Sequence, residues 1–212
     1  MDSINIIIAD DHVMIREALT DHVNQLSYTG TVRQASDGKE VLQMVKEEVP
    51  DLVLMDIQMP NMDGIECSSV LFNRYPDIKI IALTAIENPK AMVRMLELGG
   101  QGYCLKNMEL EELDRAIVSV IENDFYQNEL VVNVMRNERI TASEPHSSYQ
   151  LSDREKKILK LLTEEKTAKE IGEEVFLSPR TVEKIRNELA KSLDVRGVVG
   201  LVRYAIKNGY DI

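Results

Sequence analysis

The sequence has little cysteine and no long hydrophobic run. Among its 212 residues there are two cysteines, Cys67 and Cys104, and neither belongs to a C-x-x-C pair. This pattern indicates reduced thiols that pack in the interior, and it argues against a disulfide framework or a structural zinc site. No apolar stretch approaches about 18 residues, the length that a membrane-spanning helix needs. Residues 1–3 lead directly into an apolar segment without a basic leader, so we expect a cytoplasmic protein that does not bind membranes.

The sequence also lacks an overall surplus of positive charge. The net charge is −11, but it is unevenly distributed. Residues 1–150 contain 12 Lys and Arg against 25 Asp and Glu, a net charge of −13, whereas residues 151–212 contain 13 against 11, a net charge of +2. Only the C-terminal part therefore suits a polyanion such as DNA. Its small surplus predicts modest affinity per monomer and strong salt dependence.

The first part of the chain alternates apolar segments with segments of helical periodicity. The segment Leu52 to Met55 has no polar alternation, which indicates a strand buried on both faces, as in a parallel sheet. It ends on Asp56, which we expect to be an exposed strand tip because turn residues follow it. The remaining strands are expected at residues 4–10, 31–36, 78–84 and 102–106, and helices at residues 12–26, 38–49, 65–75, 89–99 and 109–122.

This alternation predicts an α/β domain built on a doubly wound, five-stranded parallel sheet. Ligands of such sheets bind beyond the carboxyl ends of the strands. Four of the five predicted strands end on side chains that are able to take part in chemistry, and we expect these side chains to converge in one pocket. They are Asp10 with Asp11, Asp56, Thr84 and Lys106.

The predicted pocket suits phosphoryl chemistry. Three crowded carboxylates repel one another, and an all-oxygen site of this kind suits Mg²⁺. Lys106 adds a positive charge and Thr84 a hydroxyl group, so phosphoryl oxygens would be bound beside Asp56 as the nucleophile. A general base is missing, because His12 is expected to cap or solvate the first helix. An acyl phosphate on Asp56 should therefore hydrolyse slowly, which suits a signal better than turnover.

Four segments together resemble the receiver domain of a two-component response regulator, over residues 4 to about 122. They are Ala9-Asp10-Asp11-His12, Leu54-Met55-Asp56-Ile57-Gln58-Met59-Pro60-Asn61-Met62-Asp63-Gly64, Leu83-Thr84-Ala85 and Gly102-Tyr103-Cys104-Leu105-Lys106. The resemblance implies a flavodoxin-like fold with Asp56 as the phosphoacceptor. It also implies a Mg²⁺ site formed by Asp10, Asp11, Asp56 and the backbone carbonyl of Gln58.

The same resemblance assigns roles on the neighbouring strands. Thr84 and Lys106 would follow the phosphoryl group, and Tyr103 would be the aromatic residue that changes rotamer. On the residues alone, Tyr103 could equally be a half-buried strand residue. The chain departs from the family at Asn107, where many receivers have a proline after the lysine.

A linker is predicted between two domains. The apolar pattern thins over residues 123–150, although Leu130, Val131, Val134 and Met135 could form one amphipathic helix. The polar run around His146 is typical of a flexible connection. We therefore expect a receiver domain at residues 1–122, a linker at residues 123–150 and a second domain at residues 151–212.

The second domain is predicted to be a small all-α domain with a helix-turn-helix. Capping boxes of Ser152 with Glu155 and of Thr167 with Glu170 predict two helices, and a third begins at Ser178-Pro179. In the third helix an apolar stripe lies opposite a polar face that contains Arg180, Lys184, Asn187 and Lys191. Such a face fits the major groove of DNA. The alternative is a helical domain whose charges form only a solvated surface.

The order of motifs in this domain resembles a LuxR-type DNA-binding domain, and with the receiver it resembles the NarL/FixJ architecture. The motifs are Leu151-Ser152-Asp153-Arg154-Glu155, Lys169-Glu170-Ile171-Gly172, Leu177-Ser178-Pro179-Arg180-Thr181-Val182 and Leu201-Val202-Arg203-Tyr204-Ala205-Ile206. The resemblance implies that Lys184 and Asn187 meet base edges and that Thr181 and Lys191 contact phosphates. The last helix, from about Val198, would form the dimer contact on DNA.

Two features of this domain depart from the family pattern. Glu183 stands where many members have a basic or small polar residue, and its carboxylate opposes phosphate but could accept a hydrogen bond from cytosine. Residues 197–200 replace a polar cap at the start of the last helix.

The resemblance implies a transcription factor that is switched by phosphorylation. A sensor histidine kinase would phosphorylate Asp56 with Mg²⁺, and the phosphorylated homodimer would bind double-stranded DNA. The protein would not be an enzyme beyond its own phosphotransfer and slow autodephosphorylation. One alternative is a receiver-like protein that acts through constitutive DNA or protein contacts. The other is a haloacid-dehalogenase-like phosphatase with an aspartyl nucleophile, which needs a second acid where Gln58 stands.

Overall fold

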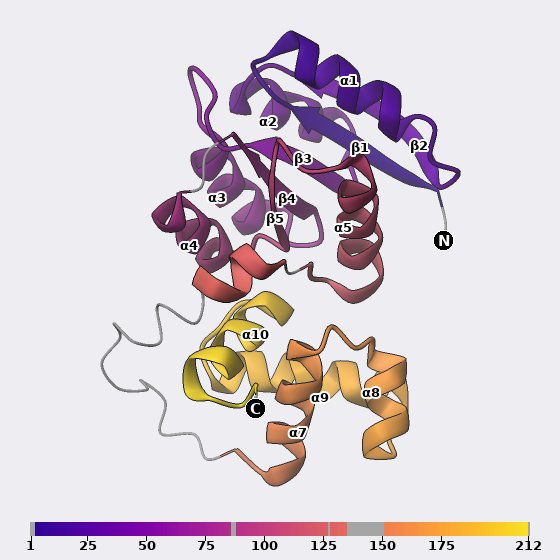
Figure 1. Cartoon of the computed structure of the whole chain (residues 1–212), viewed down its shortest axis with the longest axis vertical. Helices are drawn as coiled ribbons and strands as arrows, with labels where there is room; N and C mark the ends of the chain where they lie inside the picture. Colours follow the sequence, from indigo (N-terminus) through magenta and orange to yellow (C-terminus); the bar gives the residue numbers. More distant parts are fainter. Residues whose placement is uncertain (1–2, 86–87, 127, 135–150, 212) are drawn as a thin grey trace. The chain divides into compact units, whose positions relative to one another are not determined.

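The chain forms two compact units, Met1–Ile121 and Glu122–Ile212, each described here by itself (Figure 1). The computed structural model describes residues 3–85, 88–126, 128–134 and 151–211. In these ranges no helix combines the length and the apolar character needed to cross a bilayer. The first unit contains β1 (Ile4–Ala9), α1 (Val13–Val23), β2 (Thr29–Ala35), α2 (Gly38–Glu47), β3 (Leu52–Asp56), α3 (Gly64–Arg74), β4 (Lys79–Thr84), α4 (Pro89–Leu98), β5 (Gly102–Leu105) and α5 (Leu110–Asn123).

The five strands of the first unit form one parallel sheet in the order β2-β1-β3-β4-β5. After β2 the chain reverses direction across the sheet. Because crossover connections are right-handed, this reversal places α1 on one face and α2, α3 and α4 on the other. Helix α5 returns to the α1 face, where Nε2 of His22 lies 2.7 Å from Oδ1 of Asp114. The predicted doubly wound α/β fold is confirmed.

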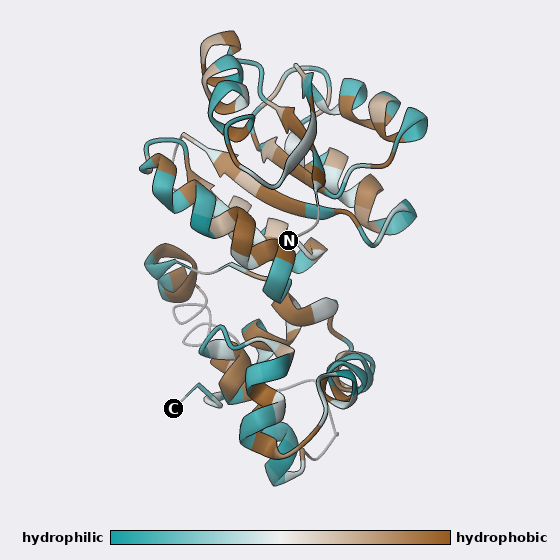
Figure 2. Cartoon of the chain, turned by 90° about the vertical axis from the view of Figure 1, so that its right-hand side faces the viewer, coloured by the Kyte–Doolittle hydropathy of each residue, from teal (hydrophilic) through white to brown (hydrophobic). Residues whose placement is uncertain are grey.

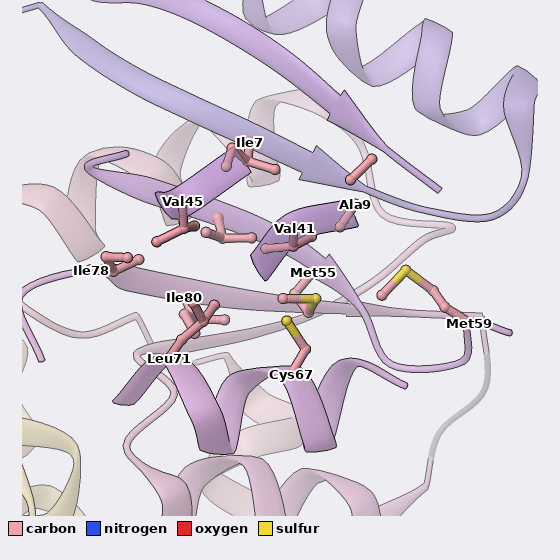
Figure 3. Close-up of a cluster of buried hydrophobic side chains, with 12 residues drawn as sticks. Ile7, Ala9, Val41, Val45, Met55, Met59, Cys67, Leu71, Ile78 and Ile80 are labelled. Atoms are coloured by element: carbon pink, nitrogen blue, oxygen red, sulfur yellow. The ribbon is translucent and has the colours of Figure 1, made fainter. Parts of the chain in front are cut away.

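The core of the first unit lies between the sheet and the helices on its two faces. All five residues of β3 are buried, as the uninterrupted apolar run predicted. Figure 3 shows one side of this core, where Val41 and Val45 of α2 and Cys67 and Leu71 of α3 meet strand residues. In Figure 2 the strands are mostly brown and the helices show hydrophilic outer turns. Central β3 is thus a rigid base for the residue at its end.

Local signals position the helices at the carboxyl edge of the sheet. The side chain of Asp37 accepts hydrogen bonds from the backbone N–H groups of Lys39 and Glu40, which caps α2. Asn88 caps α4 in the same way, and Gly99 ends α4 with a φ of 112°, a left-handed conformation that favours glycine. These caps fix where each helix begins and ends relative to the strand before it.

The second unit contains four helices in the predicted helix-turn-helix region. Both predicted capping boxes are formed, at Ser152 with Glu155 and at Thr167 with Glu170. Residues 129–134 are helical, and Val131 and Val134 are buried, whereas Met135 and His146 lie outside the described residues. The four helices are α7 (Asp153–Thr163), α8 (Ala168–Val175), α9 (Pro179–Ser192) and α10 (Gly197–Asn208).

Candidate functional site

The predicted strand-end residues converge at the carboxyl edge of the sheet. Asp10 follows β1 directly, and Asp56 is the last residue of β3. In the register of these two strands Ala9 pairs with Met55, so Asp10 and Asp56 are neighbours. From β1 the chain crosses to β2 on one side of the pair, and from β3 it crosses to β4 on the other side. Doubly wound sheets bind ligands at such a topological switch point.

Lys106 joins the two carboxylates. Its Nζ lies 2.7 Å from Oδ2 of Asp10 and 2.8 Å from Oδ2 of Asp56. The backbone N–H of Lys106 donates to the carbonyl of Thr84 over 2.7 Å, which holds the end of β5 against β4. The lysine is therefore positioned by the sheet as well as by its ion pairs.

Asp56 is buried, so the expectation of an exposed strand tip is wrong. Only 2% of its surface is accessible. The reason is the close approach of α3: a Cβ atom on Gly64 would lie 2.1 Å from the carbonyl oxygen of Asp56. The backbone N–H of Gly64 also donates to the carbonyl of Ile57, which draws the start of the helix over the end of β3.

Burial and charge act in opposite directions on the groups of the pocket. The pKa of Asp56 is raised, chiefly because the carboxyl group is desolvated, while the hydrogen bond from Lys106 opposes that rise. For Lys106, burial alone would lower the pKa, but its hydrogen bonds to Asp10 and Asp56 raise it. The raised pKa of Lys106 therefore favours its ammonium form between the side chains of Asp10 and Asp56.

The carboxylates form a site that fits a divalent cation. Ligand atoms of Asp10, Asp11, His12 and Asp56 all lie within 4.8 Å of one another. Oδ2 of Asp10 and Oδ1 of Asp11 are buried, and among the described residues the first meets the ammonium of Lys106 and the second the imidazole of His12. Carboxylate oxygens with unused acceptor capacity are the ligands that Mg²⁺ prefers. The backbone N–H of Gln58 donates to Oδ1 of Asp56 over 3.2 Å, which places the Gln58 backbone beside the same carboxylate.

His12 lies in this cluster instead of capping α1. It occupies the N-cap position, but its side chain makes no capping hydrogen bond. Its Nδ1 lies 2.8 Å from Oδ1 of Asp11, and its side chain is 65% exposed. Its backbone N–H donates to Oδ1 of Asp10. Of the two predicted roles, capping by the side chain is not seen, whereas the exposed imidazole at the start of α1 agrees with a solvated residue that also turns toward the acid pair.

Thr84 and Tyr103 lie close together on the neighbouring strands β4 and β5. Thr84 is the last residue of β4 and is 3% exposed. Tyr103 is completely buried, rather than half-buried. Burial raises the pKa of its phenol, and hydrogen bonds with the Thr84 side chain and the Asn88 backbone oppose the rise. The aromatic ring is thus turned inward, toward the threonine.

In the second unit, the six predicted DNA-contact residues share one outer face of α9. They line a shallow hollow together with Ser178 and Glu188, and Nζ of Lys184 lies 3.8 Å from Oε1 of Glu188. All are exposed except Thr181, which is half-buried beside the N-cap residue Ser178. The residues are Arg180, Thr181, Glu183, Lys184, Asn187 and Lys191.

Two residues near the pocket were not predicted from the sequence. Gly64 allows α3 to contact the backbone of Asp56. Arg16 on α1 donates a hydrogen bond to the carbonyl of Asp10. The sequence contains one signal for Arg16: it follows His12 by one helical turn, which places it on the same side of α1 as the acid pair.

Comparisons with known proteins match both units. Residues 6–118 match the response regulator receiver domain, and residues 149–205 match the luxR family of bacterial regulatory proteins. The chain is a response regulator of the NarL/FixJ class. It belongs to a family of DNA-binding transcription regulators and not of typical enzymes, and the predicted family is confirmed.

Similar proteins match over nearly the whole chain. The oxygen regulatory protein NreC of Staphylococcus carnosus is 32% identical over 209 residues, which cover 95% of this chain and 96% of NreC. The response regulator GacA of Pseudomonas viridiflava is 30% identical, with 97% of each chain covered. A structure of RcsB from Salmonella typhimurium covers 96% of this chain and 98% of its own, with a TM-score of 0.59 and 24% identity, and supports the fold.

Proposed function

We propose that this response regulator is phosphorylated on Asp56 by a sensor histidine kinase, and that phosphorylation favours a homodimer that binds double-stranded DNA. One observation carries the first step. The Asp56 carboxylate stands at the end of the central strand, 2.8 Å from the ammonium of Lys106 and within the cluster that contains Asp10 and Asp11. A buried nucleophile surrounded by groups that neutralise phosphoryl charge is suited to phosphoryl transfer.

The transfer exchanges one phosphorus bond for another. An ionised oxygen of Asp56 attacks the phosphorus of a phosphohistidine, and the P–N bond breaks with its electron pair leaving on the imidazole, which then takes up a proton. Asp10, Asp11, Asp56 and the Gln58 carbonyl would hold Mg²⁺, which neutralises phosphoryl oxygens when it is bound. Lys106 favours the ionised form of Asp56, because its hydrogen bond opposes the rise in pKa that burial causes.

The phosphoryl group would act as a ligand of the active conformation. Thr84 and Lys106 would bind its oxygens, and the hydroxyl of Thr84 would move away from its present place beside Tyr103. A ligand shifts a conformational equilibrium only through its differential affinity for the two states. The contacts to Thr84 and Lys106 must therefore be better in the dimerising form, and Tyr103 changes rotamer as the threonine moves.

The exposed face of α9 would contact DNA. Lys184 and Asn187 would meet base edges in the major groove, with Thr181, Arg180 and Lys191 on the backbone. Their common place along one shallow hollow on the outer face of α9 supports this arrangement. Helix α10 would form the dimer contact on DNA. Its N-cap residue Arg196 makes no side-chain cap, so packing rather than capping holds the start of this helix.

The proposal is tested by intact mass after incubation with Mg²⁺ and acetyl phosphate. The wild type should gain one phosphoryl group, and Asp56→Asn should gain none. Asp51→Asn is the matched control, because Asp51 lies directly before the same strand at its opposite end and should leave labelling unchanged. Labelled protein should then be more dimeric by light scattering and should bind random-sequence duplex DNA more tightly.

Three results separate the alternatives. No adduct on a wild type that binds Mg²⁺ would refute the phosphorylation switch and favour constitutive contacts. Rapid loss of the adduct with release of phosphate over many cycles would indicate a phosphatase. An adduct that leaves DNA binding and mass in solution unchanged would refute the coupling of the two units.

A further inference from the structure

Arg16 connects α1 to both β1 and β2 beside the acid pair. Its Nη1 donates to the backbone carbonyl of Asp10, and its Nε donates to Oε1 of Gln34 over 3.2 Å. A single planar guanidinium group therefore makes two hydrogen bonds in different directions. Lysine has no donor geometry that reproduces both.

The other polar groups of Asp10 are also bonded. Its N–H donates to the carbonyl of Ala35 over 3.1 Å, its Oδ1 accepts from the His12 N–H over 2.9 Å, and its Oδ2 meets the ammonium of Lys106. The carbonyl lies beyond the last residue of β1, where the chain turns toward α1. Arg16 is the donor that the structure provides for it. Since Asp10 is completely buried, loss of this donor would leave the carbonyl to find another partner by rotation.

Rotation of this carbonyl has a specific consequence. The Asp10 carbonyl belongs to the peptide group that joins Asp10 to Asp11, so its orientation depends on ψ of Asp10 and φ of Asp11, and φ of Asp11 also helps to set where the Asp11 side chain points. The Asp11 carboxylate is 33% exposed, and its described ion pair is with a largely exposed imidazole. Little else holds this carboxylate in the described part of the pocket.

We propose that Arg16 is a positioning residue for the cation site: it fixes the Asp10–Asp11 peptide so that both carboxylates face Asp56. The inference rests on the proposed function, because it assigns Arg16 to the Mg²⁺ site used in phosphorylation. Arg16 itself would contact neither the metal nor the phosphoryl group, because its guanidinium is bonded to the Asp10 carbonyl and to Gln34. Its effect passes through the peptide plane, so it should appear first in metal affinity.

The test compares Arg16→Met and Arg16→Lys with a matched control, Arg33→Met. Arg33 also donates two hydrogen bonds, but to the carbonyls of Met44 and Glu48 at the end of α2. Mg²⁺ affinity is measured by calorimetry well below the melting temperature, and the free energy of unfolding is measured in EDTA. Arg16→Met should raise the Mg²⁺ Kd about tenfold, equivalent to about 1.4 kcal/mol. Arg16→Lys should recover part of the affinity, and Arg33→Met should lose stability with an unchanged Kd.

Labelling by acetyl phosphate provides the second readout. At saturating Mg²⁺, Arg16→Met should approach the wild-type labelling rate, because Asp56 and Lys106 are intact. A wild-type Kd in Arg16→Met, or an equal rise in Kd in Arg33→Met, would overturn the positioning role while leaving the proposed function in place. A wild type that neither binds Mg²⁺ nor accepts phosphate would overturn the proposed function and this role with it.

Discussion

Lys106→Met should destabilise the metal-free receiver and tighten its binding of Mg²⁺. In the structure Nζ of Lys106 lies 2.7 Å from Asp10 and 2.8 Å from Asp56, and all three side chains are buried. Removing one partner of a buried ion pair typically costs about 3–5 kcal/mol, because the remaining charge is left uncompensated. Methionine keeps most of the length of the lysine stem, so the loss is one of charge more than of packing.

The same geometry sets the expected change in metal affinity. A cation in the site competes with the ammonium ion for the same two carboxylates. Two unit charges about 4 Å apart interact by about 4 kcal/mol at an effective dielectric constant of 20, which is an upper limit here because the lysine is able to move. We expect about 1–2 kcal/mol, or roughly tenfold tighter Mg²⁺ binding in Lys106→Met. Mg²⁺ at a hundred times its Kd would then restore about 2.7 kcal/mol of stability.

The loss of stability in Lys106→Met should depend on pH. The folded pKa of Asp56 is raised above its unfolded value, so ionised Asp56 disfavours the folded state. This cost is absent below the unfolded pKa and grows as the pH rises through the folded pKa. Lys106 opposes the rise in pKa, so its removal should destabilise the protein more at neutral pH than in mild acid.

Urea unfolding with EDTA or Mg²⁺, at several pH values, measures these effects. Lys39→Met is the control, because it removes the same charge from an exposed position on α2. Unfolding of Lys106→Met at the same urea concentration as Lys39→Met in EDTA would contradict a stabilising role of the buried lysine. Binding of Mg²⁺ by Lys106→Met no tighter than by the wild type would contradict competition between the lysine and the cation.

Three further predictions follow from other parts of the chain. Gly64→Ala places a Cβ 2.1 Å from the carbonyl oxygen of Asp56, so the free energy of unfolding in urea should fall by about 1–3 kcal/mol and labelling by acetyl phosphate should slow. An unchanged stability and labelling rate would contradict the close packing. Burial raises the pKa of Cys67 and Cys104 to about 12, so both thiols should resist alkylation at pH 8 and react only after unfolding in guanidinium. Rapid alkylation of the folded protein would show that the thiols are accessible. Glu183→Gln should tighten binding to random duplex DNA several-fold by fluorescence anisotropy, because a carboxylate opposes phosphate; unchanged binding would place Glu183 away from the DNA.

The element order of both units could be predicted because the strands of the first are buried and helices of the second begin with clear caps. The uninterrupted apolar run at residues 52–55 strongly favours a buried strand, and β3 forms there. The capping boxes begin α7 and α8 at the expected residues. The ends of the strands were predicted less accurately, since β2 begins at Thr29, two residues before the predicted start. Thr29 pairs with Ile4 across a register shift, and such a shift leaves no periodic signal in the sequence.

The candidate pocket was predictable to the extent that it depends on topology. Parallel strands end on one edge, so Asp10, Asp56, Thr84 and Lys106 were expected to converge, and they do. Side-chain direction was not predictable. The turn of His12 toward Asp11, and the contact of Arg16 with a carbonyl six residues earlier, depend on how α1 leaves the sheet. The burial of Asp56 depends on a glycine that the sequence presents only as a turn residue.

The charge of residues 151–212 bears on how a switch at Asp56 would control DNA binding. The hollow on α9 is lined by three cations and two carboxylates, and residues 151–212 carry a net charge of only +2. A single domain of this kind would neutralise few phosphates, so its own affinity for DNA should be low. Joining two such domains makes the second contact intramolecular and raises the overall affinity by about 10²–10⁴ without any new contact. Under the proposed function, phosphorylation would therefore need only to change the dimer population, and α9 itself would not need to change shape. Phosphorylated protein diluted until it is monomeric should accordingly bind DNA no better than the unphosphorylated protein.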